Sequence, residues 1–203
     1  GMMDTILNLG LNETSLQGLI KQTGNERFAW DAYRRFIQLF AKIALNIPDE
    51  PFDEKMKEIK AAYHARQDVD LKADQLKELA EAFLAIVHRH SGKPFPQDPY
   101  EQLDIAIKAV FRSWNGKRAI DYRKQFKITT DMASGTAVNI VTMVFGNMGN
   151  DSGTGVGFTR NPGTGENLIY GEYLVNAQGE DVVAGIRTPK PIAEMAQEMP
   201  EIY

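Results

Sequence analysis

The sequence has no cysteine, and it contains only three histidines and two tryptophans among 203 residues. The lack of cysteine excludes disulfide scaffolds, thiolate zinc sites and cysteine nucleophiles. No apolar run approaches the roughly 18 residues of a membrane span, and no signal-peptide pattern opens the chain, so we expect a cytoplasmic protein without a membrane partner. Basic residues are not in excess either, because the net charge is −4, which argues against nucleic-acid binding.

The amino-acid composition changes along the chain near residue 130. Residues 1–130 hold 20 Lys and Arg against 18 Asp and Glu, whereas residues 131–203 hold 3 against 9, together with eleven of the 17 glycines. Helical periodicity dominates the first part, and short apolar runs between turn residues dominate the second. We therefore predict an α+β fold, with a helical subdomain over residues 1–130 and a β-rich, glycine-containing subdomain over residues 131–203.

Helices are predicted where apolar residues recur every three or four positions. Asn25 is suited to cap a helix whose apolar stripe covers residues 36–47 and which Pro48 stops. Further stripes cover residues 76–87, ending near Gly92, and residues 103–114. The charged segment 49–70 predicts a surface helix followed by a loop.

Strands are predicted in the second part from β-branched and apolar runs. These runs cover residues 136–145, 155–159, 168–175 and 181–186, and a short helix is expected over residues 192–199. Residues 136–145 (TAVNIVTMVF) are typical of a buried strand.

A glycine-rich segment, residues 152–159 (SGTGVGFT), is the strongest local signal of a binding site. Gly153, Gly155 and Gly157 alternate along it, and without Cβ atoms they let backbone N–H groups approach an anion closely. Ser152 and Thr154 add hydroxyl groups. One hypothesis is a glycine-rich hairpin that covers phosphate groups. The alternative is a tight hairpin without a ligand.

Four charged residues are further candidates. Glu172 lies within an apolar run, where it could bind a ribose hydroxyl, a cation or an arginine, or could simply face solvent. Arg187 follows the last predicted strand and could meet a phosphate, a carboxylate or a surface acid. Arg34 and Arg35 point about 100° apart on one helix, so at most one of them is expected to face a given ligand. The histidines are assigned to the surface, and we predict no metal-ligating residue.

The motifs together resemble the pyruvate, phosphate dikinase family along the whole chain. The similar segments are residues 1–12 (GMMDTILNLGLN), 33–36 (YRRF), 109–114 (AVFRSW), 135–139 (GTAVN), 142–147 (TMVFGN), 152–162 (SGTGVGFTRNP), 170–172 (YGE), 176–185 (NAQGEDVVAG) and 187–189 (RTP).

This resemblance implies part of an ATP-grasp nucleotide-binding domain, with residues 131–203 as an incomplete nucleotide-binding subdomain. In the family, ATP, pyruvate and phosphate become AMP, phosphoenolpyruvate and diphosphate through a phosphohistidine on another domain, and Mg²⁺ is required. The partners so implied are a nucleotide and the family's phosphohistidine and pyruvate-binding domains.

The resemblance also implies roles for single residues. Gly153, Thr154 and Gly155 match the family's glycine-rich lid over the ATP phosphates. The backbone of Met143 and Val144 would read the purine edge. Three charged side chains complete the expected ATP-binding set, namely Glu172, with a nucleotide or docking role, Arg35 and Arg187.

The chain departs from the family pattern in two ways. Val141 replaces a usual glutamine, and Ser134 replaces a usual tryptophan. In addition, the family's nucleotide-binding lysine, its acidic metal-binding pair and its phosphohistidine have no counterpart here. We therefore expect a fragment with no catalytic residue and no turnover of its own, and a homodimer formed through sheet edges left open. The alternative is a truncated, non-catalytic ATP-grasp-like binding module.

Overall fold

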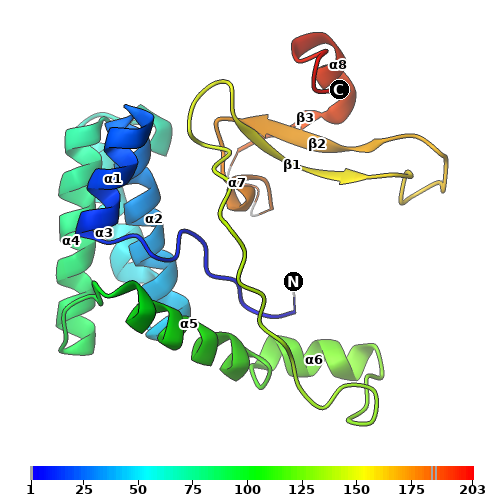
Figure 1. Ribbon diagram of the computed structural model, residues 1–203, viewed down its shortest axis with the longest axis horizontal. Helices are drawn as coiled ribbons and strands as arrows, with labels where there is room; N and C mark the ends of the chain where they lie inside the picture. The colour runs from blue at the N-terminus through cyan, green and yellow to red at the C-terminus, as the bar shows by residue number, and fades with distance from the viewer. Residues whose placement is uncertain (1, 184, 186) are drawn as a thin grey trace. The chain divides into compact units, whose positions relative to one another are not determined.

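The computed structural model describes residues 2–183, 185 and 187–203, and the chain divides into two compact units, Gly1–Met143 and Val144–Tyr203 (Figure 1). Helices make up the first unit, and a small antiparallel sheet with short helices makes up the second. The α+β class is therefore confirmed. Among the described residues, no helix is both long and apolar enough to cross a membrane.

The first unit is a set of helices arranged around α2 and α4. The helices are α1 (Glu13–Thr23), α2 (Glu26–Ala44), α3 (Glu50–Ala62), the 3₁₀ turn η1 (Asp68–Asp70), α4 (Ala73–Ser91), α5 (Pro99–Ser113) and α6 (Lys117–Gln125). The helices expected from periodicity are confirmed as α2, α4 and α5, and the surface helix expected within the charged segment 49–70 is confirmed as α3. Helices α1 and α6 were not expected, because both are short and mostly polar.

Local sequence fixes where α2 and α4 begin and end. Asn25 caps α2, and its side-chain oxygen accepts a hydrogen bond from the Phe28 amide at 3.0 Å. Helix α2 ends at Ala44, shortly before Pro48. Gly92, with a φ of 69°, ends α4 in the left-handed conformation that glycine adopts without strain.

Aromatic side chains form the centre of this unit. Phe36, Phe40 and Phe95 meet edge to face with ring centroids 5.4 to 5.5 Å apart, and Phe52 packs on Phe83 at 5.0 Å. All five are buried. Each buried phenylalanine contributes about 1.5–3 kcal/mol by leaving water, so this cluster is a large favourable term in the folding of the unit.

The second unit is a three-stranded sheet with short helices on its two faces. Its elements are β1 (Gly153–Phe158), β2 (Tyr170–Val175), α7 (Gly179–Val183), β3 (Lys190–Pro191), the 3₁₀ turn η2 (Ile192–Glu194) and α8 (Met195–Glu198). The strands are antiparallel in the order β1-β2-β3. The predicted strands 155–159 and 168–175 are confirmed as β1 and β2, and the predicted C-terminal helix as η2 and α8.

The predicted strand over residues 136–145 is wrong. The structure assigns no strand there, and Ile140, Val141 and Val144 expose 63%, 82% and 85% of their surface. β-Branched residues favour a strand only where a neighbouring strand and a packed face are present, and this segment pairs with no strand among the described residues.

The predicted strand over residues 181–186 is also wrong. A helical turn, α7, occupies Gly179–Val183, because the Asp181 carboxylate accepts a hydrogen bond from the Gln178 amide at 2.9 Å and so opens a helix. Gly185, with a φ of 67°, follows it. Residues 184 and 186 lie outside the described part of the chain.

Candidate functional site

The glycines of β1 share one face of the hairpin. Directly paired residues point to the same side of a sheet, and the register sets Gly155 opposite Tyr173 and Gly157 opposite Gly171. A Cβ atom built on Gly155 would lie 3.2 Å from the Cβ of Tyr173 and 2.6 Å from the Glu172 carbonyl oxygen. A methyl group at Gly155 is therefore incompatible with the close approach of β1 and β2. The glycine face is defined here as the side carrying Gly153, Gly155, Gly157 and Tyr173.

The same glycines direct their amides away from β2. The Asn176 amide donates to the Ser152 carbonyl at 2.8 Å, which makes this a hydrogen-bonded pair. Such pairs alternate with non-bonded ones in an antiparallel ladder, so the N–H groups of Gly153, Gly155 and Gly157 point to the outer edge of β1. Strand β1 is an edge strand of the described sheet. Its outer edge therefore has amide donors at every second residue. The backbone of Gly146 lies close to this edge at Gly153, where a Cβ atom on Gly146 would be 2.5 Å from the Gly153 carbonyl oxygen.

The C-terminal segment, η2 and α8, covers the glycine face in the second unit. A Cβ atom on Gly157 would lie 3.8 Å from Ile192 Cδ1. Between strand and segment lies a cavity of about 310 Å³. It is lined by Asp151, Gly153, Thr154, Gly155, Val156, Gly157, Glu172, Tyr173, Val175, Ile192, Met195, Met199 and Ile202. Four predicted ATP-binding residues, Gly153, Thr154, Gly155 and Glu172, thus belong to the lining, although the register directs the side chains of Thr154 and Glu172 to the other face of the hairpin.

A small polar network fastens the C-terminal segment. The Tyr173 hydroxyl donates to Glu198 Oε2 at 2.6 Å, and the Lys190 ammonium pairs with Glu198 Oε1 at 2.5 Å. The hydrogen bond to Glu198 raises the pKa of Tyr173 to about 12, with burial adding to the effect. The hydrogen bonds from Lys190 and Tyr173 lower the pKa of Glu198. The three residues are called the Glu198 latch below.

The opposite face of the hairpin carries Thr154 and Glu172. Glu172 pairs with Val156 in the register, and it is exposed, whereas Thr154 is half-buried. Thr154 lies near the start of α7, because a Cβ atom on Gly179 would be 3.9 Å from its Oγ1. The two polar side chains predicted for nucleotide binding are therefore on one face, and the glycines are on the other.

Arg187 lies beside the end of β2. Its guanidinium donates to the carbonyl oxygens of Asn176 at 2.7 Å and Val175 at 3.3 Å. The side chain thus satisfies backbone carbonyls where β2 ends. Asn147, buried just upstream of β1, has no hydrogen-bond partner for its side-chain amide among the described residues. Sequence reasoning did not single it out.

Met143 and Val144 lie in the extended segment before Gly146, at the boundary between the two units. Met143 is half-buried and Val144 is exposed. The predicted hinge strand is absent, so their backbone groups belong to no sheet in the described chain.

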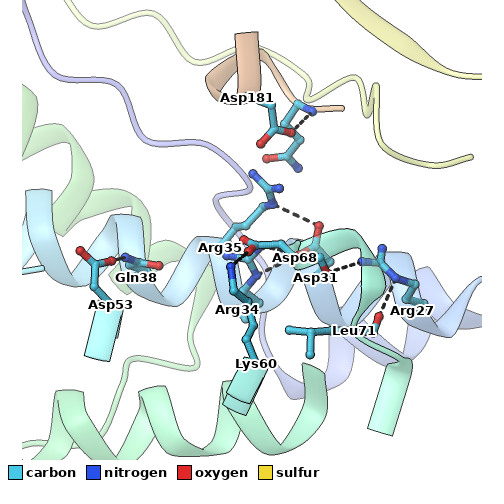
Figure 2. Close-up of polar contacts among 11 residues, drawn as sticks. Arg27, Asp31, Arg34, Arg35, Gln38, Asp53, Lys60, Asp68, Leu71 and Asp181 are labelled. Carbon is cyan, nitrogen blue, oxygen red and sulfur yellow. Dashed lines mark hydrogen bonds and ion pairs between the residues drawn. The ribbon is translucent and has the colours of Figure 1, made fainter. Parts of the chain in front are cut away.

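Arg35 belongs to a buried charge cluster of the first unit. Figure 2 shows Arg34 and Arg35 gathered at the Asp31 carboxylate, with Nε–O distances of 2.8 and 3.1 Å. Arg34 also pairs with Asp68 at 3.0 Å, and Lys60 pairs with the same carboxylate at 3.0 Å. The sequence pattern did not predict this cluster, because Asp31 and Arg34 lie on the apolar side of α2.

The cations of this cluster control the acidity of its carboxylates. Burial raises the pKa of Asp31, but the charges of Arg34, Arg35 and Arg27 outweigh burial, and the pKa falls to about 2. For Asp68, burial likewise raises the pKa, and Arg34 and Lys60 outweigh it. Both groups are therefore carboxylates at neutral pH, and Arg35 is held at Asp31.

Comparisons with known proteins cover the chain almost completely. The family model described as "Pyruvate phosphate dikinase, AMP/ATP-binding domain" matches residues 1–201. The pyruvate, phosphate dikinase of Entamoeba histolytica is 60% identical over 98% of this chain and 22% of its own length. That of Clostridium symbiosum is 56% identical over 100% of this chain and 23% of its own length.

A plant relative, the chloroplastic pyruvate, phosphate dikinase 1 of Oryza sativa subsp. japonica, is 55% identical over 100% of this chain and 21% of its own length. The chain therefore spans less than a quarter of the relatives that it matches. Both the family model and these identities extend over both units, and the chain belongs to the pyruvate phosphate dikinase AMP/ATP-binding domain family.

Proposed function

We propose that this chain binds ATP or AMP, and that the outer edge of β1 contacts the phosphate oxygens. The observation that carries the proposal is the direction of three amides. The N–H groups of Gly153, Gly155 and Gly157 point away from β2 at an edge with no further strand in the described sheet. Amides without side chains around them are suited to bind an anion through the backbone.

The remaining residues predicted to bind ATP are proposed to contact the nucleotide from the positions that the structure gives them. The backbone of Met143 and Val144 would meet the purine, and Thr154 and Glu172 would contact the nucleotide from the other face of the hairpin. Arg187 and Arg35 already donate to protein oxygens. Arginine has five N–H donors, so each can add a phosphate contact only by using those not already engaged.

The reaction of the parent protein is also proposed from family membership. The β-phosphoryl group of ATP would pass to a histidine on another domain, with the γ-phosphoryl group joining inorganic phosphate as diphosphate and AMP leaving. Pyruvate bound to a further domain would then accept the phosphoryl group from the histidine, giving phosphoenolpyruvate. Within residues 2–183, 185 and 187–203, no three His, Asp or Glu side chains lie together as a metal site. These residues do not by themselves form the Mg²⁺ site that the family implies, and we derive no magnesium-dependent step from them.

The isolated chain is proposed to bind nucleotide without completing the reaction, since it covers only 21–23% of its relatives. Incubation with Mg-ATP, pyruvate and phosphate should yield no AMP, and AMP formation at a steady rate would contradict this. A truncated, non-catalytic module would bind nucleotide in the same way. Only the length of the parent reading frame separates the two hypotheses.

A homodimer and a cytoplasmic location remain predictions. Strand β1 has no charged residue and no proline to protect its outer edge, and Val156, Phe158 and Tyr170 are exposed on one face of the hairpin. These features favour pairing with a second copy. Light scattering after size-exclusion chromatography should show a mass that rises with concentration, and a constant monomer mass would contradict it.

Calorimetric titration with Mg-ATP tests the nucleotide site. Gly155→Ala should weaken binding at least tenfold, because its methyl group would lie 2.6 Å from the Glu172 carbonyl oxygen and displace β1. Gly18→Ala is the matched control, since a Cβ atom there meets nothing within 4 Å. Equal affinity in the two variants would contradict the assignment of β1.

A further inference from the structure

We propose that the cavity between the glycine face and the C-terminal segment binds a small, uncharged, largely apolar ligand such as a fused aromatic ring. The cavity exists because Gly153, Gly155 and Gly157 place no side chain on the face that η2 and α8 cover. These three glycines alternate along β1, and the cavity over them has a volume of about 310 Å³. An apolar cavity of about 150 Å³ already accepts benzene, so this volume is sufficient for a larger ring.

The walls of the cavity are fixed. The Glu198 latch joins α8 to β2 through Tyr173 at 2.6 Å and to β3 through Lys190 at 2.5 Å. Strands β2 and β3 are themselves paired at Glu172–Pro191 and Tyr173–Lys190. The C-terminal segment is therefore held at two points, which prevents it from collapsing onto the glycines.

The lining chemistry selects an uncharged ligand. Ile192, Met195, Met199 and Ile202 form the wall opposite the glycines, and methionine adapts its shape to a bound ring. No Lys, Arg or His belongs to the described lining. Its charged members, Asp151 and Glu172, are both acidic, and the register directs the Glu172 side chain to the other face of the hairpin. A phosphate or carboxylate would be buried there without a counter-charge, which is strongly unfavourable.

This site is separate from the proposed phosphate contact. The amides for phosphate lie at the outer edge of β1, whereas the cavity lies over the glycine face. A ligand in the cavity and a nucleotide at the edge therefore do not compete for the same atoms. The inference holds whether or not the nucleotide proposal is correct.

Fluorescence titration of the 203-residue chain with the neutral probe N-phenyl-1-naphthylamine tests this site. We expect a saturable rise with one probe per chain, and no displacement by ATP. The anionic compound 8-anilinonaphthalene-1-sulfonate should displace the probe at least tenfold more weakly than naphthalene does. Displacement of the probe by ATP, or equal competition by the anion, would overturn the assignment of an uncharged, separate site.

Two variants locate the binding. Met195→Trp fills the cavity and should weaken probe binding at least tenfold, whereas Met132→Trp, at a side chain that is 72% exposed, should leave it unchanged. Gly157→Ala adds one methyl group at 3.8 Å from Ile192 Cδ1, an ordinary contact, and should weaken binding several-fold in a folded protein. Unchanged affinity in both cavity variants, or no saturable binding by the parent chain, would overturn the proposal.

Discussion

At the scale of single residues, Asp31 organises the charges of the first unit. Its carboxylate is buried and accepts hydrogen bonds from Arg34 and Arg35, and Arg34 extends the cluster to Asp68 (Figure 2). A buried ion pair is costly to break, because the remaining partner keeps its desolvation cost without compensation. Asp31 therefore links the position of Arg35 to the stability of the helical unit.

Replacing Asp31 with asparagine should lower the free energy of unfolding by about 3 kcal/mol. Half-buried Arg35 would lose the carboxylate it is held at, and buried Arg34 would keep only Asp68 as a partner. Urea denaturation measures the change. Asp104→Asn is the control, since Asp104 makes an exposed pair with Lys108 that is worth at most about 0.5 kcal/mol. A loss at Asp31 no larger than at Asp104 would contradict the role of the cluster.

The same carboxylate predicts a pH dependence. The pKa of Asp31 is about 2 in the folded chain and near 3.8 in the unfolded one, so the unfolded state binds more protons between these values. Stability should therefore fall by about 2 kcal/mol as the pH drops from about 4 to about 2. Denaturation across this range measures it. Asp31→Asn should flatten the profile, and an equally steep profile in this variant would contradict the assignment.

At the scale of elements, helices α2 to α5 could be predicted from sequence, whereas α1, α6 and α7 were not expected and two of the four predicted strands are wrong. Helix α4 follows from an apolar stripe and a terminal glycine, and both signals are local. Residues 136–145 have the side chains of a strand but no neighbouring strand among the described residues. Residues 181–186 turn into α7 because one carboxylate, Asp181, opens a helix. Pairing and capping depend on contacts that periodicity alone does not contain.

The glycine segment shows what spacing can and cannot establish about a site. Alternation along β1 correctly predicted a hairpin strand with three side-chain-free positions. It did not predict that the C-terminal segment would cover the glycine face, nor that Tyr173 and Glu198 would hold it there. These partners lie 25 residues apart and no short motif joins them.

Breaking the latch should loosen the C-terminal segment. Glu198→Gln removes the charge that Lys190 pairs with and weakens the acceptor for Tyr173. Hydrogen exchange should become faster in residues 192–203, while the helical unit exchanges at its previous rate. Glu166→Gln, at an exposed acid of the second unit outside the C-terminal segment, is the comparison. Identical protection of residues 192–203 in the parent chain and in Glu198→Gln would show that the latch does not hold this segment.

At the scale of the whole molecule, the chain forms two compact units, and the AMP/ATP-binding domain model of its family matches both of them. Three of its relatives are four to five times longer, and the chain covers 21–23% of their length. What the chain itself offers is a backbone edge suited to phosphates and a separate apolar cavity. These two features make different demands on ligands, and each can be measured on the isolated protein.

The most direct test of the nucleotide proposal is a titration of the ¹⁵N-labelled chain with Mg-ATP, followed by amide chemical shifts. The proposal predicts the largest changes at Gly153, Gly155 and Gly157, whose N–H groups face outward. The amides of Thr154 and Val156, which the register directs to β2, should change much less and serve as internal controls. Glycine amides that stay unchanged at saturating nucleotide would contradict the central claim.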